Sequence, residues 1–95
     1  MNALEKHEKN IAHDMCLLYG GNPEEMYEIM NDAVIHGRLT FDSLAYIIRH
    51  TIGLWIEKGF DIKTICEISK KASVEGLNPE QITNALIKIY HHRPY

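Results

Sequence analysis

The histidines, cysteines and clustered carboxylates of this 95-residue chain are the side chains that could do chemistry. His13 and Cys16 are three residues apart, a spacing that puts both on one face of a helix as a base and a thiol nucleophile, or as two metal ligands. A zinc site needs further ligands at suitable spacing, and none lies nearby in sequence. Because Cys16 falls in an apolar pattern, we expect it to be a core residue with His13 at the edge of the core.

No other catalytic or metal-binding pattern stands out. His91 and His92 could bind a transition metal adventitiously, but they lie where a chain end frays. The chain has no glycine-rich phosphate loop, nucleophile elbow, His-Glu-x-x-His or calcium-loop motif. Carboxylates within 23–36 could act as an acid and a base, yet nothing in the sequence places a substrate pocket between them. We expect a protein that is not an enzyme and carries no cofactor or metal.

Negative charge is concentrated in the first third of the chain. The net charge is −3, and no Lys or Arg occurs between Lys9 and Arg38. Glu24 is favoured by the positive end of a helix dipole, whereas Glu28 and Asp32, four residues apart, repel each other. A strip of like charge can steer encounter with a basic partner, and the alternative is a solvated face that keeps a small protein soluble.

Five short polar side chains precede runs of helical periodicity and can accept hydrogen bonds from the first turn of a helix. At each asparagine among them, a Glu or Gln three residues later allows a capping box. A glycine near the end of four of the runs predicts a left-handed residue there. The caps are Asn2, Asn22, Thr40, Asp61 and Asn78, and the glycines are Gly21, Gly37, Gly59 and Gly76. The predicted helices cover 3–19, 23–36, 41–58, 62–74 and 79–91.

These helices predict an all-α fold, a compact bundle of five short helices in a single domain over 1–95. The helix over 41–58 is the most apolar and should be central. Ile47 and Leu54 widen its apolar stripe into a second flank, which another subunit could cover in a homodimer. Gly53 interrupts this helix and predicts close helix packing or a bend.

The sequence also favours a cytoplasmic protein that does not associate with membranes. No apolar run reaches the roughly 18 residues of a membrane span, and the N-terminus lacks the pattern of a signal peptide. Cys16 and Cys66 lie inside apolar helical patterns, which favours reduced, buried thiols over a disulfide framework.

The leading hypothesis is a non-enzymatic interaction protein, an adaptor, inhibitor or regulator, that binds a basic protein partner through a helical face. Acidic residues would steer the encounter, and exposed aromatic or apolar residues would anchor it. The candidate binding residues are Glu24, Tyr27, Glu28, Asp32, Ile47 and Leu54.

The alternative is a DNA-binding transcriptional regulator that uses a helix-turn-helix-like corner within 62–90. Ala72, Gly76 and Ile82 keep the spacing of such a motif. Glu80 at the start of the second helix and the acidic net charge oppose contact with phosphate, so nucleic acid is the less favoured partner. The side chains that would face outward to the DNA are Gln81, Thr83, Asn84 and Lys88.

Overall fold

The computed structural model describes residues 2–56 and 61–91, apart from five side chains inside the helices: Ile52, Leu54, Trp55, Ile56 and Tyr90. Its helices are α1 (Ala3–Tyr19), α2 (Pro23–His36), α3 (Phe41–Ile56), α4 (Ile62–Val74) and α5 (Pro79–His91). All five predicted helices are confirmed, and residues 57 and 58 of the predicted third helix lie outside the described residues.

Each helix begins at the polar side chain that the sequence predicts. The Asn2 side chain accepts a hydrogen bond from the Glu5 backbone N–H at 2.7 Å, and the Asp61 carboxylate accepts one from Thr64 at 2.8 Å. Asn22 and Thr40 accept from the first turns of α2 and α3. Asn78 and Gln81 form a reciprocal capping box at the start of α5. These bonds satisfy N–H groups that the helix itself leaves without partners.

The predicted left-handed glycines are confirmed at two positions. Gly21 and Gly76 both have φ near +100°, a conformation that costs glycine little and other residues much more. Gly59 lies outside the described residues.

At Gly37 the prediction of a left-handed residue is wrong, and the reason for glycine is a close approach. Its φ is −122°, in the extended region. A Cβ atom there would lie 2.7 Å from the Ala33 carbonyl oxygen and 2.8 Å from the Ser73 hydroxyl of α4. The same hydroxyl accepts a hydrogen bond from the Arg38 N–H at 2.9 Å and donates one to the Lys70 carbonyl at 2.7 Å. Gly37 therefore lets the turn after α2 dock directly on α4.

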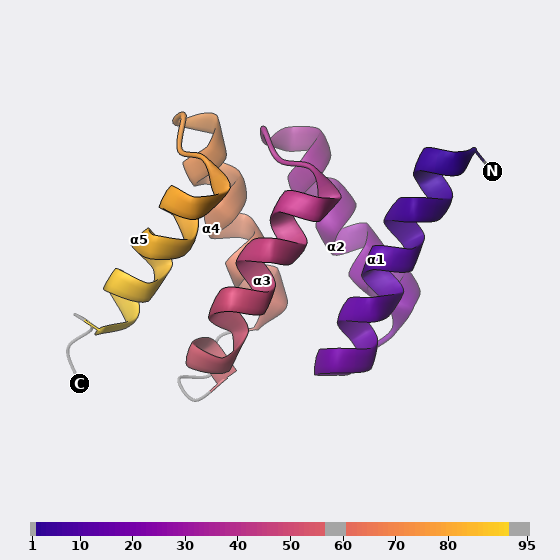
Figure 1. The fold of residues 1–95 in the computed structure, drawn as a ribbon, viewed down its shortest axis with the longest axis horizontal. Coiled ribbons are helices and arrows are strands. Elements are labelled where there is room, and N and C mark those ends of the chain that lie inside the picture. The colour runs from indigo at the N-terminus through magenta and orange to yellow at the C-terminus, as the bar shows by residue number, and fades with distance from the viewer. Residues whose placement is uncertain (1, 57–60, 92–95) are drawn as a thin grey trace.

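The helices form two layers, with α1, α3 and α5 in one and α2 and α4 in the other (Figure 1). The molecule measures 45 × 29 × 16 Å along its principal axes, the shortest dimension being the thickness of the two layers. α3 contacts each of the other four helices, which confirms the prediction that it is central. None of these helices, over the described ranges, combines the length and the apolarity needed to cross a bilayer.

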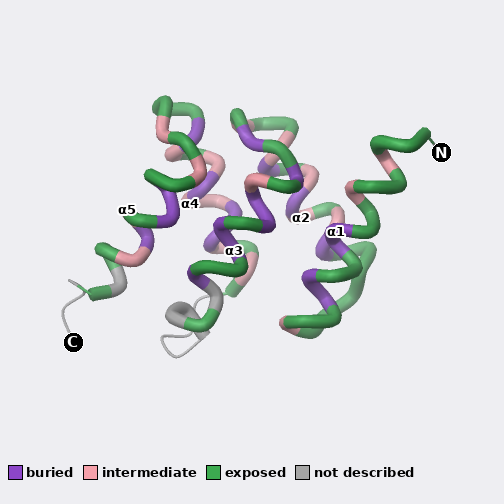
Figure 2. Tube along the Cα trace, in the orientation of Figure 1, coloured by how far each residue is buried: buried purple, intermediate pink, exposed green. Residues whose placement is uncertain are grey.

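The core lies between the two layers, where the buried positions of all five helices face one another (Figure 2). Each helix contributes at least one large side chain with no exposed surface: Met15, Met30, Leu44, Ile65 and Ile82. The expectation that Cys16 and Cys66 are buried is also confirmed.

The structure corrects the candidacy of Ile47 as a binding residue, because its side chain has no exposed surface. α3 has a neighbour on both sides in its own layer and packs on α2 and α4 as well, so the chain itself covers the flank that contains Ile47. The side chain of Leu54 lies outside the described residues. A homodimer built on this flank would therefore gain nothing from Ile47.

Three apolar residues that lie at helical spacing from core residues are nevertheless largely exposed: Leu4 (67%), Leu18 (60%) and Ile89 (50%). All three lie on α1 and α5, the two outer helices of their layer, each of which has only α3 as a neighbour in that layer. An edge helix covers fewer of its own apolar positions than a central one.

Candidate functional site

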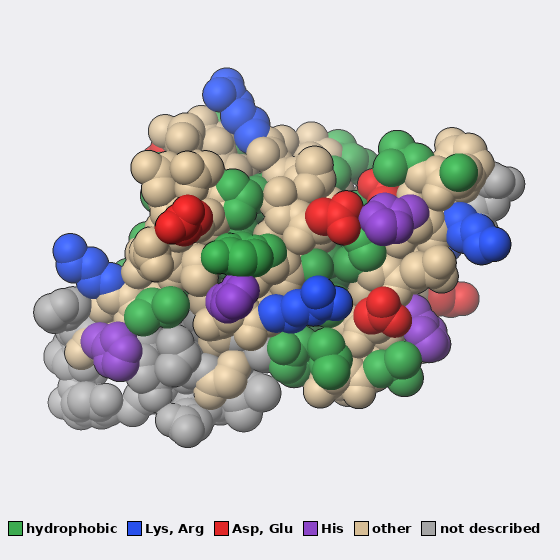
Figure 3. All heavy atoms as spheres, viewed as in Figure 1, with side chains coloured by type: hydrophobic (Ala, Val, Ile, Leu, Met, Phe, Trp, Pro, Cys, Tyr) green, Lys and Arg blue, Asp and Glu red, His purple; other side chains and the backbone are tan. Residues whose placement is uncertain are grey.

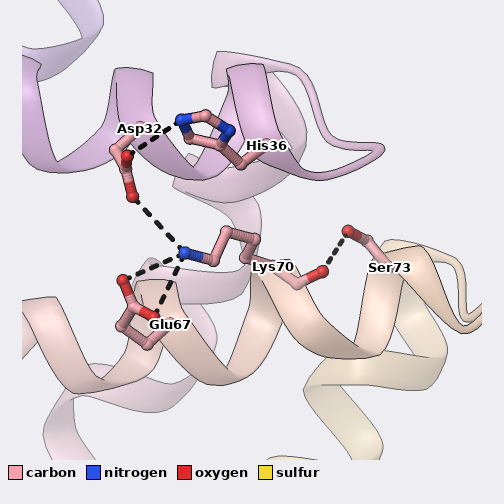
Figure 4. Close-up of polar contacts among 5 residues, drawn as sticks. All are labelled: Asp32, His36, Glu67, Lys70 and Ser73. Carbon is pink, nitrogen blue, oxygen red and sulfur yellow. Dashed lines mark hydrogen bonds and ion pairs between the residues drawn. The ribbon is translucent and has the colours of Figure 1, made fainter.

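Asp32, the last residue of the acidic strip predicted along 23–36, contacts basic side chains of α2 and α4. One of its carboxylate oxygens lies 3.5 Å from His36 Nε2, and the other lies 3.5 Å from Lys70 Nζ on α4 (Figure 4). Lys70 also contacts Glu67 at 3.2 Å, and this hydrogen bond is the main reason that the pKa of Lys70 is raised. Asp32 thus belongs to a charged cluster that joins α2 to α4, with a cation supplied by a residue distant in sequence.

Glu24 and Glu28 keep unneutralised charges. Both are exposed, and neither forms an ion pair with any residue that the structure describes. They line a groove of about 540 Å³ between α1 and α2, which we call the acidic groove. Its charged and aromatic lining consists of Glu5, Lys9 and His13 from α1 and Tyr27, Glu24 and Glu28 from α2.

Tyr27 is partly buried in the acidic groove rather than free on the surface. Its ring stacks on Phe41 of α3 with 5.4 Å between centroids and 22° between planes, and the Lys9 ammonium lies over it at 5.6 Å from the centroid. Burial raises the pKa of the Tyr27 phenol, and the nearby carboxylates of Glu8 and Glu5 raise it further. The ring is therefore held in place at a point of negative potential.

The sequence did not single out the α1 side of this groove. Glu5 and Lys9 are one turn apart and form an exposed ion pair at 3.8 Å, a spacing that is visible in the sequence. The sequence did not show that this face of α1 turns towards Glu24 and Glu28, because that depends on how α1 packs on α2.

The pair of His13 and Cys16 does not make a nucleophilic site. His13 is exposed in the acidic groove, whereas Cys16 is buried in the core, and burial raises the pKa of its thiol. A raised pKa disfavours the reactive thiolate. Among residues 2–56 and 61–91, no three side chains of the His, Cys, Asp and Glu types gather as a metal site would require. His92 lies outside the described residues.

The buried Cys66 thiol predicts that the stability of the fold depends on pH. Burial, then the charges of Glu67 and Asp61, raise the pKa of its thiol to about 12. The unfolded thiol has a pKa of about 8.5, so the folded state keeps the proton longer and stability is lost as the pH rises from about 8.5 to 12. Above a pH of about 8.5, the free energy of unfolding should therefore fall with pH. We expect Cys66→Ala to make this fall less steep by up to about 1.4 kcal/mol per pH unit relative to the unsubstituted protein. Urea unfolding at a series of pH values measures it, and equal slopes for the two proteins would contradict the assignment.

The corner between α4 and α5 only partly presents the side chains predicted to face DNA. Thr83 is 5% exposed and donates its hydroxyl hydrogen to the Pro79 carbonyl at 2.8 Å, so the prediction that it faces outward is wrong. It follows Ile82 on the side of α5 that packs inward. Gln81 is exposed, but its side chain is engaged in the capping box with Asn78. Asn84 and Lys88 are exposed as expected, and their role with nucleic acid stays a prediction.

Over its described residues, the face formed by α1, α3 and α5 shows no second acidic patch (Figure 3). Its carboxylates are scattered among Lys, Arg, His and apolar side chains (Figure 3). Asp42 pairs with His7 at 3.1 Å, and the Tyr46 ring lies 4.2 Å from that of His50. The acidic groove is therefore distinguished from this face by the convergence of its charges.

No protein-family model matches the chain, and neither the curated proteins nor the solved structures include one with significant similarity to it. The geometry and charge of the acidic groove are accordingly what a functional proposal can be built on.

Proposed function

We propose that the protein is a non-enzymatic interaction protein that binds a basic segment of a protein partner in the acidic groove. The observation that carries the proposal is the convergence of Glu5, Glu24 and Glu28 on one groove. Among the described residues that line it, Lys9 is the only Lys or Arg. Such an arrangement attracts cationic segments and sets their register, and salt weakens it.

Two further observations support binding rather than a merely solvated face. The groove is concave, with about 540 Å³ of space. One wall is Tyr27, whose ring is fixed against Phe41, so that little side-chain freedom is lost when a ligand covers it. Aromatic residues held in this way are common anchors of interfaces.

A charge-reversal experiment tests the proposal. The probe is a fluorescein-labelled hexa-arginine peptide, and its fluorescence anisotropy reports binding. We expect Glu24→Lys/Glu28→Lys to weaken binding by about tenfold or more at low ionic strength, since two close attractions become repulsions. Binding to the unsubstituted protein should also weaken as salt is added.

The matched control is Glu75→Lys/Glu80→Lys, which changes the net charge by the same amount at exposed sites outside the acidic groove. Glu80 lies in the first turn of α5, as Glu24 lies in the first turn of α2, so Glu80→Lys and Glu24→Lys carry a similar helix-dipole cost. Equal loss in the two double variants would mean that only net charge matters. That result, or no binding by the unsubstituted protein at low salt, would contradict the proposal.

A labelled random-sequence DNA duplex separates this function from the alternative of DNA binding. The acidic groove predicts no affinity for a polyanion. Micromolar duplex binding that weakens steeply with salt, and that is lost in Asn84→Ala/Lys88→Ala, would favour the DNA-binding alternative instead.

A further inference from the structure

Lys9 lies where a partner's cation would be expected to bind. Its ammonium is over the Tyr27 ring, 5.6 Å from the centroid, and 3.8 Å from a Glu5 carboxylate oxygen. An aromatic face combined with a carboxylate is a common environment for a bound cation. Within the acidic groove, this subsite is already filled by a side chain of the protein itself.

Little holds Lys9 in that place. The Lys9 side chain is 45% exposed and its Glu5 partner 41%, and the pair is one turn apart on a single helix. Exposed ion pairs of this kind contribute little to stability and are screened by salt. Because the long lysine side chain can turn out into water, the subsite can be vacated without any change in the backbone.

The subsite stays negative with Lys9 present. Three carboxylates line the groove, and Glu8 lies near enough to Tyr27 to raise the pKa of its phenol together with Glu5. One ammonium leaves most of this charge unbalanced. An incoming cation is therefore attracted before Lys9 has moved.

The chemistry of the subsite favours arginine over lysine as the incoming residue. A guanidinium is planar, stacks on an aromatic face and donates two parallel hydrogen bonds to a carboxylate. Tyr27 supplies a ring that Phe41 holds in position, and Glu24 and Glu28 supply carboxylates without ion-pair partners among the described residues. A lysine ammonium could only reproduce the contact that Lys9 already makes.

We propose, building on the function proposed above, that the acidic groove binds an arginine of an extended basic peptide segment, whose guanidinium displaces Lys9 from the face of Tyr27. Lys9 is then an internal competitor that lowers affinity for weakly basic segments and is replaced by arginine-containing ones.

Removing the charge of Lys9 tests whether this side chain competes with the incoming arginine. Lys9→Met keeps the length of the side chain and removes its charge, and Lys6→Met makes the same change on α1 outside the groove. In the hexa-arginine titration, we expect Lys9→Met to bind about two- to fivefold more tightly than Lys6→Met, the range expected for losing one exposed cation–π competitor. Hexa-lysine of the same length should bind the unsubstituted protein more weakly than hexa-arginine does.

The ring is tested by a pair of substitutions at Tyr27. Tyr27→Phe keeps the aromatic face and should retain the preference for arginine, whereas Tyr27→Leu should lose it. Circular dichroism at the assay temperature confirms that each variant is folded. The Tyr27 ring-proton resonances of the unsubstituted protein should shift on addition of hexa-arginine.

The outcomes separate this proposal from the function on which it rests. Equal affinities of Lys9→Met and Lys6→Met, with unshifted Tyr27 resonances, would overturn the displacement of Lys9 even where Glu24→Lys/Glu28→Lys still abolishes binding. No binding of either peptide by the unsubstituted protein would overturn both proposals.

Discussion

Ile47→Ala is expected to lower the free energy of unfolding by about 2–5 kcal/mol. Ile47 has no exposed surface and lies on α3, the helix that contacts all the others. Removing three carbons there loses their transfer free energy and leaves a cavity that surrounding helices only partly fill. Urea denaturation, with the midpoint and slope fitted for each protein, measures the change.

Ile35→Ala is the matched control, because it is the same substitution at a helical site that is 64% exposed. A change within about 0.5 kcal/mol is expected there. Ile47→Val, which removes one carbon, should cost about 0.5–1.5 kcal/mol. Similar small changes for Ile47→Ala and Ile35→Ala would contradict the burial of Ile47.

Gly37→Ala is expected to lower the free energy of unfolding by about 1–3 kcal/mol, the typical cost of overpacking. The added Cβ would meet the Ala33 carbonyl at 2.7 Å and the Ser73 hydroxyl at 2.8 Å. Neither atom can retreat easily, since the carbonyl belongs to α2 and the hydroxyl is fixed by hydrogen bonds to Arg38 and Lys70. Backbone φ is not the cause, because −122° is open to every residue.

Gly53→Ala, in contrast, is expected to raise the free energy of unfolding. Gly53 is exposed inside α3, and a Cβ there meets no described atom within 4 Å, so the described residues give no support to close packing, one of the two predictions at this glycine. Alanine is favoured over glycine in a helix interior by about 1 kcal/mol. Thermal and urea unfolding of both variants give the comparison, and destabilisation of equal size at the two glycines would contradict the assigned contacts.

The predictions at Ile47 and Gly37 concern the packing of α3 and of the turn after α2, and both helices contribute to the acidic groove. α1 and α2 form its walls, and Phe41, the first residue of α3, supports Tyr27 from behind. Loss of core packing around α3 would therefore be expected to loosen the groove as well as the fold.

The extent of the helices was readable from the sequence because its causes are local. A capping oxygen such as that of Asn2 or Asp61 acts within three residues, and Gly76 ends α4 through its own backbone conformation. The apolar stripe of α3 likewise predicts a central helix, because burial follows the amount of apolar surface to be covered.

Which helix faces are covered was decided by tertiary packing. Ile47 is buried since α3 has neighbours on both sides, while Leu4 and Leu18 are exposed since α1 lies at the edge of its layer. An apolar pattern indicates that a side chain can be buried. The number of neighbouring helices determines whether that side chain is in fact covered.

The acidic groove was likewise predictable from the sequence only in part. The sequence by itself determined that Glu24 and Glu28 are on one helix, one turn apart and without a basic residue nearby in the chain. Only the tertiary structure decided that Lys70 pairs with Asp32, and that Glu5, Lys9 and Tyr27 lie beside Glu24 and Glu28. Charge repulsion along a helix is a local effect set by spacing, whereas neutralisation and convergence depend on side chains that meet only when helices pack.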